Sequence, residues 1–382
     1  MKVIIAHNSY QVKGGEDAVV KFESELLTDY GDDVDIFIRE NDEISSLVKK
    51  IKTFLNVHYS TDSYRVMLQN IGDKSPDVVH VHNFFPLFSP SIFEACLDRS
   101  VPTVLTLHNF RTICPTALLM WKDKICERSL SESAYWAVPQ KVYKNSILGT
   151  LALAHMIEYH KKRGTWDRWV TRYICLTEFA KSRFVAAGFP ESKISIKPNF
   201  IPDPGYEKNN QDRGYGLFLG RLSKEKGLDV ALDAWKNVDF PLKVLGEGDV
   251  LGFVPSNVEI LGRKPKDEVI SFLRGSKFLV MPSVWYEGFP MVILEAFACG
   301  VPVVCSRLGS MAEIVTNGLT GLHFEPGNAL DLAEKIQWMI DHSREAAMMG
   351  ENARQEYQLK YTPEENYRQL KAIYQTAITE SK

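Results

Sequence analysis

Hydrophobic and polar positions along the chain form a repeating pattern of short apolar runs and longer amphipathic stretches. In the first half, five runs rich in Val, Ile and Leu have the composition of strands buried on both faces: 2–6, 77–81, 102–107, 172–177 and 194–198. Stretches with helical spacing lie between them, including 16–30 and 178–187. This alternation of strands and helices predicts an α/β fold with a parallel sheet covered by helices on both faces.

The second half repeats the same alternation. Helices are predicted to begin near Gly227, Lys266 and Pro290. The apolar runs of this half are 216–220, 242–246, 258–262, 278–282 and 302–306. Two such sheets predict two Rossmann-like domains, and a length of 382 residues also favours two domains.

The predicted boundary between the domains lies in a segment rich in proline and polar residues. Three prolines occur between Pro198 and Pro204, and a polar run from Glu207 to Arg213 follows. We therefore expect an N-terminal domain over 1–200 and a C-terminal domain over 201–361. A last helix over 362–382, capped by Thr362, is expected to cross back onto the first domain.

Composition excludes several classes of protein. The net charge of −3 argues against a broad nucleic-acid-binding surface, so we expect no nucleic-acid partner. No apolar run approaches the roughly 18 residues that span a bilayer, and the apolar N-terminal run is too short for a signal peptide. Six cysteines in a chain this long do not make a disulfide framework, which favours the cytoplasm. Cys114 and Cys126 lack histidine partners for zinc, and we predict no metal site.

The segment 281–306 carries the strongest candidate chemistry. It is predicted to run from a strand through a loop into a helix that begins after Pro290. Gly288 in that loop would let the backbone pass close to a ligand. The free N–H groups at the start of the helix would then face an anion; they belong to Phe289, Met291 and Val292.

Two glutamates flank the start of this helix. Glu287 lies in the loop, and Glu295 lies within the helix among apolar residues, where an unpaired carboxylate is costly to bury. Ribose hydroxyls are natural donors for such a carboxylate. The alternative is structural: Glu287 would interact with the helix dipole and Glu295 with a protein partner.

A second candidate segment follows the first strand of the second half. Gly220 ends the strand, and Arg221 and Lys226 flank a short loop before a helix. Cations at the carboxyl end of a parallel strand point into the ligand crevice of an open sheet. A planar guanidinium and a compact ammonium suit a diphosphate, although solvated surface charge is the simpler alternative.

The Glu-x7-Glu pair and the Gly-Arg…Lys-Gly loop resemble those of the retaining glycosyltransferases of family 4, over essentially the whole chain. The resemblance implies the GT-B fold, with two Rossmann-like domains facing across a cleft. It further implies that Arg221 and Lys226 hold the diphosphate of a sugar donor, that Glu295 binds its ribose and that Glu287 binds the sugar hydroxyls. Gly262 and Arg263 fall where the family frames the base of the nucleotide.

In the first domain, Gly14 and Gly15 resemble the family's glycine-rich loop beside the sugar phosphates. A plain turn is the alternative. Their spacing is not Gly-x-Gly-x-x-Gly, which disfavours a dinucleotide-dependent dehydrogenase.

Four further residues of the first domain end predicted strands or reach the hinge. His108 follows the strand 102–107, where the family commonly has a histidine near the transferred sugar. His82 and Asn83 end the preceding strand and are weaker candidates. Asn199 lies where the family often has Asn-Gly at the hinge, but Phe200 replaces the glycine here.

The stretch 141–172 has a net charge of +5 with interleaved aromatic residues such as Trp166 and Trp169. This pattern suits a helix at an anionic membrane surface that delivers a lipid-linked acceptor; a solvated basic face is the alternative. An expected location is therefore the cytoplasm, at the inner face of the membrane.

The resemblance implies a retaining glycosyltransferase with a UDP- or GDP-sugar donor. The cations and the helix N-terminus can stabilise a leaving diphosphate without a metal ion, so we expect the enzyme to be metal-independent. Its acceptor would be a glycan or a lipid-linked saccharide in surface polysaccharide synthesis, and no cofactor is expected. There are two alternatives: a nucleotide-sugar epimerase of the same fold, and a non-catalytic nucleotide-sugar-binding subunit, which belongs to a different functional class. The epimerase would act without an acceptor and would need an acid and base at C2 of the sugar; the subunit would be expected to lose some of the charged residues above.

Overall fold

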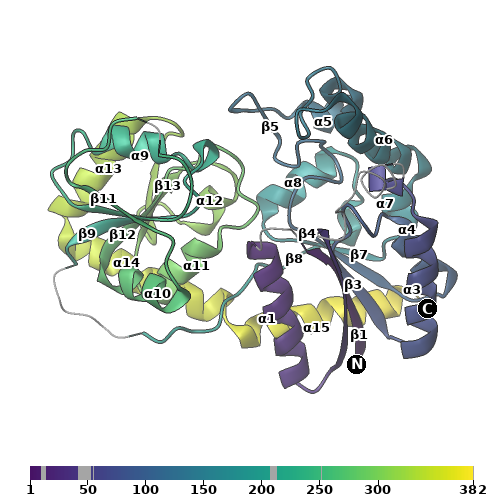
Figure 1. The fold of residues 1–382 in the computed structure, drawn as a ribbon. Helices are drawn as coiled ribbons and strands as arrows, with labels where there is room; N and C mark the ends of the chain where they lie inside the picture. Colours follow the sequence, from purple (N-terminus) through teal and green to yellow (C-terminus); the bar gives the residue numbers. More distant parts are fainter. Residues whose placement is uncertain (10–13, 42–52, 55, 207–212, 251, 382) are drawn as a thin grey trace. The chain divides into compact units, whose positions relative to one another are not determined.

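The computed structural model describes the chain except residues 10–13, 42–52, 55, 207–212, 251 and 382 (Figure 1). Most of the polar run predicted as a linker therefore lies outside the described residues. The chain forms two compact units. The first comprises Met1–Trp121, Cys126–Pro198 and Asn366–Lys382, and the second comprises Lys122–Ile125 and Asn199–Glu365.

The first unit is built on a six-stranded sheet in which every recorded strand pair is parallel. The strands, in their order across the sheet, are β2 (Asp33–Glu40), β1 (Lys2–Ser9), β3 (Val78–Asn83), β4 (Thr103–Leu107), β7 (Arg172–Cys175) and β8 (Ile194–Ile196). Five of these strands match the apolar runs of the sequence. The sixth, β2, was not predicted, because its alternating exposed positions follow the pattern of a half-covered edge.

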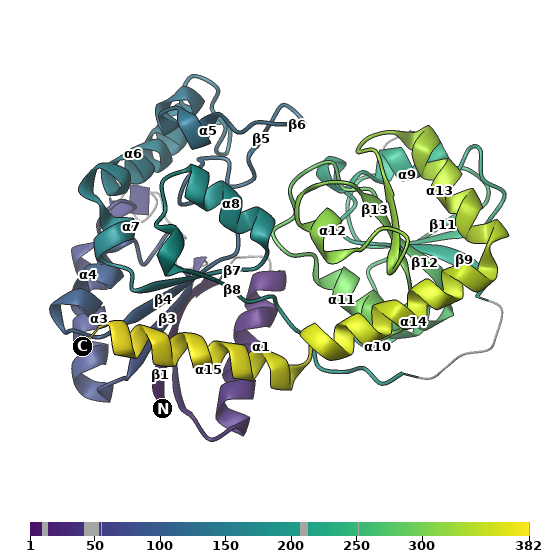
Figure 2. The ribbon, with the colours of Figure 1, turned by 180° about the vertical axis from the view of Figure 1, so that it is seen from behind.

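Helices cover both faces of this sheet (Figures 1 and 2). They are α1 (Gly15–Asp29), α3 (Thr61–Lys74), α4 (Ser91–Asp98), α5 (Arg128–Ser131), α6 (Ile147–Arg163), α7 (Thr165–Arg168), α8 (Glu178–Ala186) and α15 (Pro363–Glu380). A short hairpin of β5 (Met120–Trp121) and β6 (Lys124–Ile125) precedes α5. No helix among the described residues is long and apolar enough to cross a membrane.

The last helix, α15, packs on the first unit beside α1 (Figure 2). The Thr362 hydroxyl accepts a hydrogen bond from the N–H of Glu365 at 3.3 Å, as expected for a capping residue. Lys371 forms an ion pair with Asp32. The apolar face of α15 is buried; its buried residues are Asn366, Leu370, Ile373, Tyr374 and Ala377. Burial of this face makes the helix part of the first unit's core.

The second unit has its own six-stranded parallel sheet. Its strands, in order, are β11 (Val258–Gly262), β10 (Leu242–Leu245), β9 (Tyr215–Leu219), β12 (Ser276–Met281), β13 (Val303–Ser306) and β14 (Gly321–Phe324). Its helices are α9 (Leu228–Ala234), α10 (Lys266–Gly275), α11 (Met291–Ala298), α12 (Gly309–Ile314), α13 (Ala329–Asp341) and α14 (Ser343–Lys360). The edge strand β14 was not predicted either.

Successive residues of the central strands divide the core of the second unit into two layers. Leu279 and Leu217 face one layer, which contains α10, α11, α12 and α14. Val280 and Phe218 face the other, which contains α9 and α13. The sheet is therefore buried on both faces, and its loops emerge at the carboxyl ends of the strands.

Candidate functional site

The strand order of the second sheet reverses between β9 and β12, because β10 and β11 extend one way from β9 while β13 and β14 extend the other. Ligands of open parallel sheets bind at the carboxyl ends of the strands at such a point. A 3₁₀ turn at Lys224–Lys226 follows β9, and the loop 282–290 follows β12. The N–H of Val284 donates to the carbonyl of Glu225 at 3.0 Å, which joins the two loops.

Two of the predicted residues meet at this junction. The Lys226 ammonium donates to both carboxylate oxygens of Glu287, at 2.7 and 3.0 Å. Ser283 Oγ and Trp285 Nε1 also donate to Oε1 of Glu287, at 2.7 and 3.0 Å. Glu287 is only 5% exposed. Its Oε1 is thus saturated by protein donors. The Lys226 ammonium is the one protein donor to Oε2 among the described residues, so Oε2 can accept from a further hydroxyl.

Arg221 lies beside this pair at the end of β9 and differs from it in exposure. Its side chain is 69% exposed, and its guanidinium lies 3.5 Å from the carboxylate of Glu225. An exposed pair of this kind is weak, worth about 0–1 kcal/mol. The guanidinium is therefore free to reorient toward a ligand at small cost.

The start of α11 presents unsatisfied backbone donors, as predicted. The residue before the helix is Pro290, in an extended conformation and without a side-chain acceptor. The N–H groups of Met291 and Val292 thus have no capping side chain, and the helix dipole favours an anion there. The carbonyl of Gly288 accepts from Ser310 Oγ at 3.0 Å, and the ring of Phe289 packs against Tyr361. These contacts hold the loop in place.

Glu295, on α11, has a protein partner. Its carboxylate forms an ion pair with Lys266 at the start of α10. Glu295 is buried, while the side chain of Lys266 is 57% exposed and can move away. The structural alternative for Glu295 and a role in binding a ribose are both compatible with this geometry.

Glycines line the carboxyl ends of β9, β10 and β11. The N–H of Gly246 donates to the carbonyl of Gly262 at 2.9 Å. At φ +153°, a Cβ on Gly246 would lie 1.7 Å from the carbonyl oxygen of Gly220, so only glycine fits. The Arg263 guanidinium is exposed and lies 3.7 Å from the carboxylate of Glu247. The close approach of these backbones leaves peptide groups, rather than side chains, at this edge.

In the first unit, Gly14 is the N-cap of α1, and Gly15 is its first residue. The N–H of Gly14 donates to Asp17 Oδ2 at 2.8 Å. Burial alone would raise the pKa of Asp17, but hydrogen bonds from His7, Ser9 and this N–H lower it to about 2. A Cβ on Gly14 would meet nothing within 4 Å, so the protein itself does not require glycine there.

His108 follows β4 and is 8% exposed. Its Nε2 lies 3.0 Å from Nδ1 of His82, at the end of β3. Burial lowers the pKa of His108 to about 3, so the imidazole is neutral at physiological pH. Asn83, beside His82, donates from Nδ2 to the carbonyl of Asn8 at 2.8 Å and is structural. Asn199 is buried, and its Oδ1 has no hydrogen-bond partner among the described residues.

Sequence reasoning missed a buried ion pair behind His108. Lys197 Nζ lies 2.5 Å from Glu23 Oε1, and both side chains are buried. The sequence does indicate that Glu23 needs a buried partner, because it lies on the apolar face of α1 together with Val19, Val20 and Leu26.

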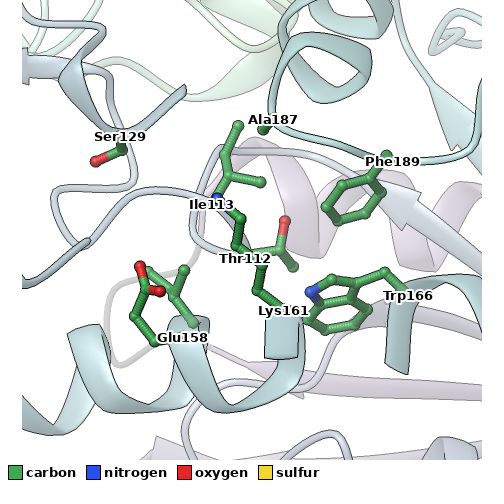
Figure 3. A pocket seen from close by; sticks show the side chains of 9 residues that line it. Thr112, Ile113, Ser129, Glu158, Lys161, Trp166, Ala187 and Phe189 are labelled. Atoms are coloured by element: carbon green, nitrogen blue, oxygen red, sulfur yellow. The ribbon is translucent and has the colours of Figure 1, made fainter. Parts of the chain in front are cut away.

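The prediction that the tryptophans of 141–172 lie on a membrane-facing surface is wrong. Trp166 and Trp169 are buried in the core of the first unit and offer no surface for lipid. Trp166 lines a small pocket with Phe189, Glu158 and Lys161 (Figure 3). With room for about 20 Å³, the pocket holds little more than a water molecule.

Among the predicted residues, Lys226 and Glu287 are in direct contact, while Arg221, Arg263 and Glu295 are paired with other side chains. His108 belongs to the first unit with the Gly14–Gly15 turn. The second unit carries its own cluster of cations, backbone donors and carboxylates at the switch point of its sheet. That cluster is suited to a phosphorylated ligand with hydroxyl groups.

Comparison with known proteins agrees with this geometry. The glycosyl transferases group 1 family matches residues 203–356, and glycosyltransferase family 4 matches residues 14–203. An uncharacterised glycosyltransferase of Methanocaldococcus jannaschii is 30% identical over 342 residues, which cover 86% of this chain and 83% of the relative. The chain belongs to glycosyltransferase family 4, and its fold is GT-B.

Two further proteins are informative. The capsular polysaccharide biosynthesis glycosyltransferase CapM of Staphylococcus aureus is 28% identical over 208 residues, which cover 51% of this chain and 54% of CapM. The solved structure of Anabaena HepE in complex with UDP has a TM-score of 0.66 and 16% identity, with 97% of this chain and 99% of HepE covered.

Proposed function

We propose that this glycosyltransferase takes a sugar from a nucleoside-diphosphate donor, with retention of anomeric configuration and without a metal ion, and transfers it to a glycan or lipid-linked acceptor. The observation that carries the proposal is the joined pair of loops at the switch point of the second sheet. There Arg221 and Lys226, the uncapped start of α11 and the Glu287 carboxylate lie together.

Charge explains how this group of residues would act. Cleaving the sugar–phosphate bond builds negative charge on the leaving diphosphate, and fixed cations and a helix N-terminus can stabilise it. Arg221 and Lys226 would supply the cations, and Glu287 would hold Lys226 in position while Oε2 accepts from a sugar hydroxyl. The acceptor hydroxyl would attack from the face of the leaving group and pass its proton to the departing phosphate oxygen. No enzyme nucleophile is assigned.

The remaining residues have supporting roles in this proposal. The Glu295 carboxylate would release Lys266 and accept hydrogen bonds from the ribose hydroxyls. The backbone at Gly246 and Gly262, together with Arg263, would face the base. His108, Asn199 and the Gly14–Gly15 turn would contact the sugar and its phosphates. UDP in the HepE structure supports a uridine donor, and CapM, named for capsular polysaccharide, supports a role in surface polysaccharide synthesis.

The test begins with donor selection. Thermal denaturation with UDP, GDP, ADP and their sugar conjugates, in EDTA and in magnesium, should show stabilisation by one nucleoside in both conditions. A ligand at 100 times its dissociation constant adds about 2.7 kcal/mol. Transfer with the selected donor should then fall by roughly 100- to 1000-fold in Arg221→Met.

Matched variants sharpen this test. Lys224 lies in the same turn, and its side chain is 67% exposed, so Lys224→Met should leave turnover within about twofold of wild type. Lys226→Met leaves Glu287 without its cation, and the double variant Lys226→Met/Glu287→Gln removes that unpaired charge. Equal activity in Arg221→Met and Lys224→Met would refute the proposed role of the cations.

For the acceptor, we propose that the start of α6 lies at an anionic membrane surface. Leu148 is 64% exposed there, and Ile147 and Leu151 are exposed beside it. Lys141 and Lys144 are exposed in the preceding turns. Apolar side chains flanked by lysines suit the headgroup region of such a membrane.

Liposome flotation would test this surface. Lys141→Glu/Lys144→Glu should weaken binding to vesicles containing phosphatidylglycerol by at least about 30-fold, because each lysine near the surface is worth about 1 kcal/mol. Lys236→Glu/Lys360→Glu, in the second unit, carries the same charge change as a control. Arg163 is unsuitable for the test because it forms an ion pair with Glu94 at 2.7 Å. Equal binding by the two double variants would exclude the membrane surface.

A further inference from the structure

A chain of buried side chains leads from the interior of the first unit to His108. The Glu23 carboxylate, on α1, accepts from Lys197 at Oε1. Its other oxygen, Oε2, lies 3.4 Å from Nε2 of His82; this is a charge contact, and neither atom has a hydrogen-bond partner among the described residues. Nδ1 of His82 in turn lies 3.0 Å from Nε2 of His108. All four side chains are buried, and His108, at the carboxyl end of β4, is the most exposed of them at 8%.

The protonation states of this chain follow from its charges. Burial opposes ionisation of Glu23, but the Lys197 ammonium holds its pKa below the ordinary value, so the carboxylate accepts hydrogen bonds only. Burial lowers the pKa of His82 well below its ordinary value. Both His82 and His108 are therefore neutral, and each ring carries one N–H donor and one lone pair.

Only one arrangement of protons suits this geometry. A lone pair on Nε2 of His82 would face the Glu23 carboxylate and be repelled, so Nε2 carries the proton. Nδ1 of His82 is then an acceptor, and Nε2 of His108 must donate to it. Nδ1 of His108 is left with a lone pair, and no described hydrogen bond uses that atom.

We propose that Glu23 and His82 are positioning residues that fix the tautomer of His108, so that its Nδ1 accepts a hydrogen bond from a ligand hydroxyl at the end of β4. The hydroxyl belongs to the donor sugar, a step that rests on the proposed function. The tautomer itself does not depend on that step. The relay also orients the imidazole plane, because the rings of His82 and His108 stack 5.3 Å apart.

A metal ion is the competing explanation, because Glu23, His80 and His82 bring ligand atoms within 4.8 Å of one another. The chemistry of the donors opposes it. The Lys197 ammonium already neutralises Glu23, and a second cation beside it would be repelled. His80 has both ring nitrogens in hydrogen bonds of 2.8 Å, to Tyr374 and Thr106. The cluster is better suited to holding protons than to holding an ion.

Nitrogen NMR of the full chain labelled with ¹⁵N-histidine tests the relay without any substrate. In wild type at pH 7, the proton should reside on Nε2 in both His82 and His108, with Nδ1 bare in each. Resonances are assigned from the variants His82→Asn and His108→Asn. A proton on Nδ1 of either ring would overturn the proposal, whether or not other variants fold.

Steady-state kinetics provide a second test. A merely structural role for His82 would not give different kcat values in the two variants that follow. His82→Leu removes the acceptor for His108 and should lower kcat by roughly 10- to 100-fold, with KM for the donor within about threefold. His82→Asn restores an amide oxygen near the position of Nδ1 and should recover most of the loss. Equal kcat in His82→Leu and wild type, or an equal loss in His82→Leu and His82→Asn, would overturn the proposal.

A third variant addresses the carboxylate. Glu23→Gln/Lys197→Met removes both buried charges together, so neither is left unpaired. Without the carboxylate, the Nδ1–H tautomer of His108 should become populated in the NMR spectrum. An unchanged tautomer would show that Glu23 does not set it. Because the spectra need no sugar donor, these results are separable from any failure of the proposed function.

Discussion

Acidification should destabilise the first unit much more than the second, because the first unit buries neutral histidines. Burial lowers the pKa of His80 and His82 well below the ordinary value, that of His108 to about 3 and that of His160 to about 4. In the unfolded chain the same side chains titrate near pH 6.5. Below that pH the unfolded state binds protons that the folded state does not.

The sign and the size of the effect follow from this difference. A histidine with a lower pKa in the folded state binds its proton more tightly in the unfolded state. The protein therefore loses stability as the pH falls below the pKa of that histidine in the unfolded chain. Between pH 7.5 and 5.5, each buried histidine should therefore lower the free energy of unfolding by about 1.4 kcal/mol, and the four together by about 5 kcal/mol. Among the described histidines of the second unit, only His323 has a resolved pKa decrease; it is half-buried, and solvent screening keeps its contribution below about 1 kcal/mol.

Hydrogen exchange measured by mass spectrometry suits this prediction, because it reports each unit separately in a chain that is not expected to unfold in one step. Peptides from β3 and β4 report the first unit, and peptides from β12 and β13 act as the internal control. After correction for intrinsic exchange rates, the opening free energy of the first unit should fall by several kcal/mol from pH 7.5 to 5.5. An equal fall in both units, or none in the first, would refute the assignment of neutral buried histidines.

Three further predictions concern individual features. Gly246→Ala should destabilise the second unit by several kcal/mol, because its Cβ would strike the carbonyl of Gly220; Gly214→Ala, with open space at its Cβ, is the control in thermal denaturation. Truncation after Tyr361 removes α15 and should abolish hydrogen-exchange protection of β3, whereas retained protection would contradict its place in the core. Glu295→Gln should weaken donor binding by about 10-fold in calorimetry with little change in thermal stability, and unchanged affinity would favour the structural alternative.

Most of the strands that sequence predicted are central ones, buried on both faces, where hydrophobicity is continuous, although the edge strands β8 and β11 were predicted as well. In the two large sheets, the strands that sequence missed are the edge strands β2 and β14. In β2 the uninterrupted apolar run is only Ile36–Ile38, between Asp35 and Arg39, and both isoleucines are half exposed; β14 is only four residues long. An edge strand pairs with one neighbouring strand and packs against helices distant in sequence. The local pattern of hydrophobic residues therefore predicts it poorly.

For the candidate site, sequence placed the loops but not the partners of their side chains. Glu287 and Lys226 are 61 residues apart, and their ion pair exists only because β9 and β12 are neighbours in the sheet. The same holds for Glu23 and Lys197, which are 174 residues apart. Trp166 was interpreted as a surface residue because charge surrounds it in sequence, whereas tertiary packing buries it.

The diphosphate site is best tested by calorimetric titration of UDP and GDP in EDTA against wild type, Arg221→Met and Lys224→Met. We expect one of the two nucleotides to bind wild type and Lys224→Met equally. Arg221→Met should bind that nucleotide at least about 10-fold more weakly, since a hydrogen bond to a charged group is worth about 1.5–3 kcal/mol. Absence of binding by both nucleotides, or equal affinity in all three proteins, would contradict a diphosphate site at the end of β9.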